Sequence, residues 1–364
     1  MNIPVYTPDL SGNEKKYALD ALESGWISSI GAYVDRFEKS LAEETGFRNV
    51  IAVSNGTVAL HLAIHCLDIG PGDEVIVPTF TYIASVNTIA QTGARPVFVD
   101  VQPSDWLMDP EQIERKITSK TKAIMPVHLY SGLCDDSVNE LARRHGLAII
   151  EDCAEALGSR RSGRHAGMSA DVATFSFFGN KTITTGEGGA VASNNDALAA
   201  RMRKVKGQGQ SLTRRYWHDE LGFNYRMTNI AAAVGVAQME RLPQIVERKQ
   251  HIARLYRSLL AGLPFDFQNP SGDVTSNEWL VSLLLPEGTD RDGIMAEMAA
   301  NGVDTRPVFY CAHHMPMYFT DERFPVAENI ASRGISLPSY PALTDEDIER
   351  VCNVLKLACK VASV

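Results

Sequence analysis

The sequence predicts an α/β fold with a doubly wound sheet, and three observations lead to that prediction. Short runs rich in β-branched and apolar residues alternate with helical segments through the first two-thirds of the chain. Several of these runs are apolar almost throughout, which is typical of strands that helices cover on both faces. The length of 364 residues exceeds one comfortable core, so we expect a second, smaller domain as well.

The order of the elements follows from these patterns. The expected strands span residues 49–53, 74–77, 96–101, 123–128, 148–151, 172–177 and 190–193, and the helices between them 58–67, 84–92, 110–117 and 136–145. A helical stretch at 231–257 contains Pro243, which cannot donate a helix hydrogen bond, so we expect a break there.

Beyond that stretch the pattern changes to an α+β layer. We expect strands at 279–285 and 304–308 and helices at 290–301 and 344–358. The sequence therefore predicts a large domain over residues 1–245 and a smaller C-terminal domain over residues 246–364.

Charge and composition exclude several classes of function. The chain has 35 basic and 44 acidic residues, a net charge of −9, which argues against nucleic acid or an anionic membrane as a partner. The first ten residues lack the pattern of a secretory signal, and the apolar runs are too short to cross a bilayer. Six scattered cysteines form no CxxC pair, which is typical of reduced thiols. We expect a cytoplasmic protein.

Lys181 stands at the most informative position in the chain. It follows the apolar, aromatic run Phe175-Ser-Phe-Phe and precedes the Gly-rich turn that ends at Gly189. Apolar walls desolvate an ammonium group and make it less basic, as a lysine that forms a Schiff base requires. A lone lysine after a buried strand is more often an ordinary surface residue, so the interpretation depends on two further segments.

The first of these segments supplies carboxylates. Asp152 ends an apolar strand, where ligands bind in open α/β sheets. A carboxylate there can keep a pyridine nitrogen protonated, and that ring is the electron sink of pyridoxal chemistry. The alternative for Asp152 is a helix N-cap. Glu155 either faces the phenolic oxygen of the ring or forms half of a capping box.

The second segment, Ser54-Asn-Gly-Thr57, follows a strand and opens a helix. Backbone N–H groups at a helix start form an anion site, so Gly56 and Thr57 are candidates for binding a phosphate. An ordinary N-cap is the alternative. Ser176 can add a hydroxyl to the same phosphate. Tyr82 is a candidate for stacking on the cofactor ring, with a buried core aromatic as the alternative.

The C-terminal part contains Arg306-Pro-Val-Phe-Tyr310 and His313-His-Met-Pro-Met-Tyr318. The two adjacent histidines suggest a metal site, but no third ligand stands at a suitable spacing, so we expect none. Arginine, histidine and aromatic side chains suit a nucleotide base and a pyrophosphate instead.

These segments together resemble the DegT/DnrJ/EryC1/StrS family of sugar aminotransferases over almost the whole chain. The segments that carry the resemblance are Gly25-Trp-Ile-Ser-Ser29, Ser54-Asn-Gly-Thr-Val-Ala-Leu60, Glu151-Asp-Cys-Ala-Glu-Ala156, Gly186-Glu-Gly-Gly189 and Asn224-Tyr-Arg-Met227. Three further segments resemble members that aminate C4 of GDP-4-keto-6-deoxymannose with L-glutamate: Phe177-Phe-Gly-Asn-Lys-Thr-Ile-Thr-Thr185, Gln208-Gly209 with Arg215-Tyr-Trp-His218, and Thr305-Arg-Pro-Val-Phe-Tyr310.

The resemblance implies the fold type I of pyridoxal 5'-phosphate (PLP) enzymes, with pyridoxamine 5'-phosphate as the alternate cofactor form, and a homodimer with shared active sites. It assigns Lys181 to the Schiff base, Asp152 to the pyridine nitrogen and Tyr82 to the ring, with Gly56, Thr57, Ser176 and the partner's Asn224 at the phosphate. Glu155 stands where many relatives have glutamine or histidine. The resemblance also implies contacts between the nucleotide sugar and Trp26, Ser28, Glu187, Arg215, Arg306, Tyr310 and His314.

Because the chain has lysine where one branch of the family has histidine and dehydrates C3, we expect amination, with a product used in O-antigen lipopolysaccharide. Three alternatives stay open. The first is an aminotransferase of the same family that acts at C3 or C4 of another nucleotide sugar. The second is a non-catalytic protein of the same fold. The third, a nicotinamide dehydrogenase, lacks a G-x-G-x-x-G after the first strand.

Overall fold

The computed structural model describes residues 2–211 and 213–360. Its centre is a seven-stranded mixed sheet in the order β1-β9-β8-β5-β4-β2-β3, in which only β9 runs antiparallel to its neighbours. The strands are β1 (Asn49–Val53), β2 (Glu74–Pro78), β3 (Arg95–Val99), β4 (Thr121–Ile124), β5 (Ala148–Asp152), β8 (Val172–Ser176) and β9 (Gly189–Ser193).

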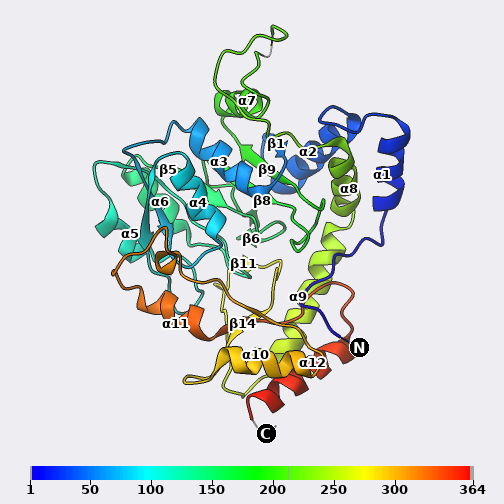
Figure 1. Cartoon of the computed structure of the whole chain (residues 1–364), viewed down its shortest axis with the longest axis vertical. Helices are drawn as coiled ribbons and strands as arrows, with labels where there is room; N and C mark the ends of the chain where they lie inside the picture. Colours follow the sequence, from blue (N-terminus) through cyan, green and yellow to red (C-terminus); the bar gives the residue numbers. More distant parts are fainter. Residues whose placement is uncertain (1, 212, 361–364) are drawn as a thin grey trace.

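Helices cover both faces of this sheet, and alternate residues along a strand show it. On β1, Ile51 and Val53 pack into the core beneath helix α3, whereas Val50 and Ala52 face the core that includes Phe37 of α2. Figure 1 shows α2 and α8 beside one end of the sheet and α4 to α6 toward the other. The helices of this part are α1 (Glu14–Glu23), α2 (Ala32–Thr45), α3 (Gly56–Cys66), α4 (Ile83–Gln91), α5 (Pro110–Lys116), α6 (Asp136–Arg144), α7 (Asp196–Val205) and α8 (Asn229–Met239).

The expected helix at 231–257 is interrupted near Pro243. Helix α8 ends at Met239, and helix α9 (Leu242–Leu259) begins with Pro243 in its first turn, where the missing N–H costs no helix hydrogen bond. Figure 1 shows α9 descending from the main sheet to the yellow and red elements, with both chain ends in that lower part.

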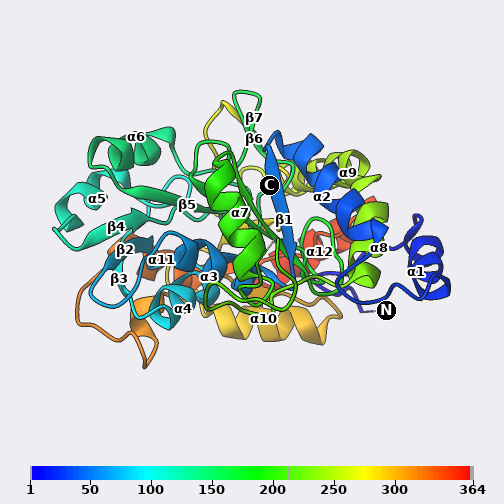
Figure 2. The same ribbon diagram turned by 90° about the horizontal axis from the view of Figure 1, so that it is seen from above.

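The C-terminal region forms a four-stranded antiparallel sheet in the order β10-β12-β14-β13, which shares a core with α9, α10 and α12. Its elements are β10 (Asp266–Phe267), β12 (Ser282–Leu284), α10 (Arg291–Ala300), β13 (Arg306–Pro307), η1 (Ala312–His314), α11 (Pro325–Arg333), β14 (Gly334–Ser336) and α12 (Asp345–Ala358). A small third sheet consists of β6 (Arg160–Arg161), β7 (Arg164–His165) and β11 (Val274–Thr275). In Figure 2 it lies at the top edge.

The sequence patterns found the seven strands of the main sheet but not all of the helices. Helices α1, α2, α7 and α11 were not predicted, and the expected strand at 279–285 is shortened to β12. Among the described residues, no helix is long and apolar enough to cross a membrane.

Candidate active site

A cavity of about 640 Å³ opens beside the carboxyl ends of the parallel strands, where ligands bind in open α/β sheets. Residues from the main sheet and from the C-terminal region line it together. The structure places these predicted site residues around it: Gly56, Thr57, Tyr82, Asp152, Glu155, Ser176, Lys181, Glu187 and Arg306.

The Lys181 side chain is largely shielded from solvent and is held by two contacts. Its Nζ lies 3.2 Å from Glu155 Oε1 and 4.0 Å from the centre of the Trp279 ring. The backbone of the turn is fixed as well. The Tyr6 hydroxyl donates to the Lys181 carbonyl at 2.7 Å, and the Trp279 indole N–H donates to the Asn180 carbonyl at 2.7 Å. The lysine therefore projects into the cavity from a backbone that two side-chain hydrogen bonds restrain.

Glu155 is the charged partner of this lysine. Its Oε2 accepts the Tyr130 backbone N–H at 2.9 Å, and its other oxygen faces Lys181. Burial raises the pKa of the Glu155 carboxyl to about 7, while the nearby Lys181 charge acts in the opposite direction. The capping-box alternative does not hold, because turns rather than a helix follow β5 at this point.

Asp152 is the last residue of β5 and is buried. Its Oδ2 accepts the Ser85 hydroxyl at 2.7 Å, and its Oδ1 accepts the Ala154 backbone N–H at 3.0 Å. No helix begins after Asp152, so the N-cap alternative does not hold either. A fixed, buried carboxylate at a cavity wall suits a cationic ring nitrogen.

The start of helix α3 forms the opposite end of the cavity. Asn55 is the N-cap, since its side chain accepts the Val58 backbone N–H at 2.9 Å, so the Thr57 hydroxyl is not used for capping. A Cβ atom on Gly56 would lie only 2.8 Å from the Ser176 Cβ, so the close approach there requires glycine. Backbone donors, two hydroxyls and the helix dipole thus converge on a site for an anion.

A row of contacting aromatic rings runs along the cavity from Lys181 to Tyr82. Trp279 stacks on Tyr130 with ring centres 5.8 Å apart, Tyr130 stacks on Phe309 at 5.4 Å, and Phe309 contacts Tyr82 at 5.6 Å. Tyr82 lines the cavity and is 56% exposed, whereas Phe80 is fully buried in the core. Of the two aromatic residues in that segment, only Tyr82 is therefore placed to contact a ligand.

Sequence reasoning missed Trp279, Tyr130, Ser85 and Tyr6. Trp279 was assigned to a strand, and Tyr130 lies between the expected strand at 123–128 and the expected helix at 136–145. Tyr130 has φ of 55°, a left-handed backbone that is unusual for a bulky side chain. That conformation depends on tertiary contacts, so no short-range pattern in the sequence could reveal it.

The other predicted residues do not line the cavity of this chain. They are exposed on its surface: Trp26, Ser28, Arg215, Asn224, Tyr310 and His314. Asn224 accepts a hydrogen bond from Arg226 Nε at 3.0 Å, and the Tyr310 hydroxyl accepts one from Arg291 Nη2 at 3.2 Å. A single chain therefore assembles only part of the predicted site.

Comparison with known proteins places this geometry in a family. Residues 8–356 match the DegT/DnrJ/EryC1/StrS aminotransferase family, and the chain belongs to it. The chain is 49% identical over 360 residues to GDP-perosamine synthase from Vibrio cholerae, covering 97% of this chain and 98% of that protein. It is 50% identical over 352 residues to GDP-perosamine synthase from Escherichia coli O157:H7, covering 96% of each. The PLP form of Spr1654 from Streptococcus pneumoniae superposes with a TM-score of 0.94 at 30% identity, covering 100% of both chains.

Proposed function

We propose that the protein is a PLP-dependent aminotransferase that converts GDP-4-keto-6-deoxy-D-mannose to GDP-perosamine, with L-glutamate as the amino donor. The observation that carries the proposal is the grouping of Lys181, Asp152 and the α3 anion site in one cavity. The reaction is inferred from the family, and the sugar from the two relatives named GDP-perosamine synthase.

The residues present fit PLP. Gly56, Thr57 and Ser176 would hold the phosphate, because a Cβ on Gly56 would close that cradle and neither hydroxyl caps α3. Asp152 would pair with the pyridine nitrogen, and Tyr82 would stack on the ring. When bound, PLP supplies an electron sink that makes the hydrogen on the carbon next to the substrate nitrogen acidic.

Lys181 has the central role among the side chains. Its amine removes a proton from one carbon atom and returns it to another, so that one group acts as base and then as acid. Glu155, 3.2 Å away, accepts a hydrogen bond from the ammonium form and keeps Nζ at the cavity wall during the transfer. The hydrogen bonds from Tyr6 and Trp279 hold the backbone on which Lys181 turns. The apolar walls exclude water from the proton that moves.

We infer that the active unit is a cytoplasmic homodimer with shared active sites and that its product serves the synthesis of a surface polysaccharide such as an O-antigen. The exposed positions of Asn224 and Arg215 support a shared site, because neither residue lines the cavity of its own chain. Trp26, Ser28, Tyr310 and His314 would then complete the sugar-nucleotide site together with Glu187 and Arg306.

The test is an absorbance spectrum of the purified holoenzyme, first with L-glutamate and then with GDP-4-keto-6-deoxymannose. We expect glutamate to bleach the band of the bound cofactor and the keto sugar to restore it. Bleaching without restoration would discard the sugar and keep the aminotransferase. A panel of GDP-, UDP- and dTDP-linked keto sugars then separates the proposed substrate from the alternative, another sugar aminated at C3 or C4.

A further inference from the structure

Two clusters of histidine and other possible metal ligands lie outside the residues that line the active-site cavity. One joins His128, Glu151 and Cys153 behind the end of β5, and the other joins His313, His314 and Glu328 between η1 and α11. In each cluster the ligand atoms lie within 4.8 Å of one another. The hydrogen bonds around the two clusters differ, and that difference decides which of them can bind a cation.

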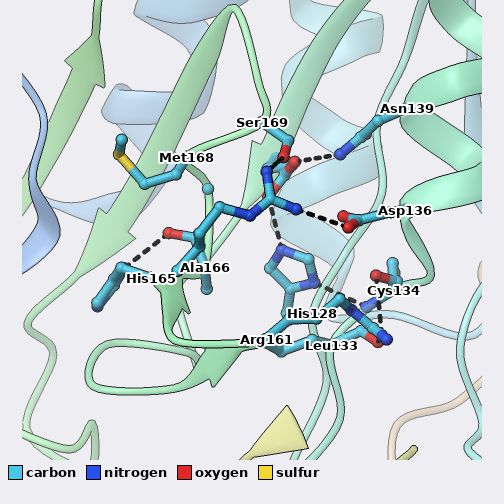
Figure 3. Close-up of a pocket in the computed structure, with 13 residues that line it drawn as sticks. His128, Leu133, Cys134, Asp136, Asn139, Arg161, His165, Ala166, Met168 and Ser169 are labelled. Carbon is cyan, nitrogen blue, oxygen red and sulfur yellow. Dashed lines mark hydrogen bonds and ion pairs between the residues drawn. The ribbon is translucent and has the colours of Figure 1, made fainter. Parts of the chain in front are cut away.

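The cluster behind β5 is a closed hydrogen-bonded pair. Cys134 donates its backbone N–H to His128 Nδ1 at 3.0 Å, so the ring proton lies on Nε2, which contacts Glu151 at 2.9 Å. Neither ring nitrogen has a free lone pair for a metal. The adjoining cavity, shown in Figure 3, has a volume of about 30 Å³, which is room for roughly one water molecule. This cluster therefore has a structural role.

The second cluster has an open coordination position. His313 is 1% exposed, and its Nε2 forms no hydrogen bond, although it lies 3.4 Å from Glu328 Oε1. Zinc ligands bind at about 2.0–2.1 Å in tetrahedral geometry, which separates two ligand atoms by about 3.3–3.4 Å. The His313–Glu328 separation thus matches two ligands of one ion. The His128–Glu151 separation of 2.9 Å matches a hydrogen bond.

The groups around the second cluster hold its ligands in place. The Thr79 hydroxyl lies 2.7 Å from His313 Nδ1, and a hydroxyl can accept the Nδ1 proton and so leave Nε2 free. Glu328 is oriented by two hydrogen bonds to its Oε1, from the Phe324 backbone N–H at 2.9 Å and from Arg323 Nε at 3.0 Å. An ion bound at Oε1 would replace the bond from Arg323, whose side chain is exposed. The His314 ring centre lies 4.0 Å from that of His313, and its exposed side chain can supply the third nitrogen.

We propose that His313, His314 and Glu328 form a binding site for a divalent transition-metal ion of the Zn²⁺ type, with water as the fourth ligand. The sequence contains the two histidines side by side, but the third ligand comes from α11 and is brought in only by folding. The ion would tie η1 to α11 and, through Thr79, to the end of β2. None of the three residues lines the active-site cavity of this chain. His314 is also one of the residues proposed to contact the sugar nucleotide, whereas Glu328 is not, so zinc binding by Glu328→Gln separates the two roles.

The test measures zinc binding to the untagged holoenzyme at free zinc concentrations set by a chelator, with bound zinc counted by elemental analysis. We expect one zinc per wild-type chain and a loss of affinity of at least tenfold in His314→Ala and in Glu328→Gln. Thr79→Val keeps the shape of the side chain and removes the hydroxyl, so it should weaken zinc binding by about 10- to 100-fold. His145→Ala, at a histidine outside the cluster, is the matched control and should bind like the wild type.

A second readout guards against variants that fold poorly. Zinc should raise the unfolding temperature of the wild type and of His145→Ala but not that of Glu328→Gln, because a ligand stabilises only the folded state that binds it. Absence of zinc from the wild type at micromolar free zinc would overturn the proposal. Equal binding by wild type, His314→Ala and Glu328→Gln would also overturn it.

Discussion

The turn that carries Lys181 and the loop between α7 and α8 were both predicted to supply active-site residues, and the structure places them in opposite surroundings. The Lys181 side chain is 12% exposed and is held by Glu155 and Trp279. In the loop, Tyr216 is 77% exposed, and Figure 1 shows the green segment projecting beyond α7. The contacts of the Lys181 turn come from its own chain, whereas the loop between α7 and α8 extends away from that chain.

This difference shows that a strand end fixes the position of a side chain relative to the cavity, whereas a projecting loop does not. Asp152 ends β5 and Lys181 follows β8, so the pairing of these two strands brings the two residues to the same edge of the sheet. The loop residues Arg215 and Asn224 are fixed by no such pairing to the cavity. In the proposed homodimer, a second chain would supply the missing contacts.

Replacement of Lys181 should have the largest effect. Lys181→Ala should abolish turnover, because among the described residues no other amine lines the cavity to move the proton. Lys181→Arg should be inactive as well, since a guanidinium does not lose its proton near neutral pH. Steady-state rates with keto sugar and glutamate measure this, with Lys15→Ala on exposed α1 as the control. Near-normal rates in either Lys181 variant would contradict the assignment.

Asp152→Asn tests the other strand end. The amide keeps the shape and can still accept the Ser85 hydrogen bond, but it removes the charge opposite the ring nitrogen. Breaking a buried charge pair costs about 3–5 kcal/mol, so kcat/KM should fall by about 10²- to 10⁴-fold. Asp135→Asn is the control, because Asp135 caps α6 and should alter stability rather than kcat/KM. A loss of less than fivefold in Asp152→Asn would remove Asp152 from the proposed role.

Mixing two variants tests the projecting loop. If Asn224 serves the partner's cavity, Asn224→Ala alone should weaken PLP binding by about tenfold, as expected for a lost bond to a charged phosphate. A mixture of Lys181→Ala and Asn224→Ala chains then forms some sites that have both native residues. At limiting PLP, the mixture should exceed the summed activity of the separate variants. Activity equal to that sum would place Asn224 outside the shared site.

The sequence predicts one half of this comparison better than the other for physical reasons. Apolar strands and the polar residues at their ends are short-range features, so the main sheet, Lys181, Asp152 and Gly56 could be found without a structure. Trp279 could not, because it reaches Lys181 from the C-terminal region across a contact far apart in sequence. The proximity of Glu328 to His313 could not be predicted for the same reason. Helix α1 was missed because it buries only Glu14 and Ala21, which leaves no apolar stripe to find. Helix α2 has such a stripe, at Tyr33, Val34, Phe37 and Leu41, which could have predicted it.

A smaller effect is expected from the burial of Glu155 beside Lys181. The pH dependence of the stability of the cofactor-free protein measures it. Burial raises the pKa of Glu155 from 4.5 to about 7, so the folded protein binds this proton more tightly than the unfolded chain does. The resulting stabilisation is fully present below pH 4.5 and is lost as the pH rises through 7. The loss is on the order of 3 kcal/mol.

Glu155→Gln cannot titrate, so its free energy of unfolding should fall less than that of the wild type between pH 4.5 and pH 8. Urea unfolding across this range measures the difference, with the exposed Glu287→Gln as the control that should follow the wild type. Parallel curves for wild type and Glu155→Gln would mean that water reaches Glu155. A hydrated carboxylate would screen the charge of Lys181 much as solvent does. The contrast between a shielded Lys181 and an exposed loop would then depend on the Lys181–Trp279 contact alone.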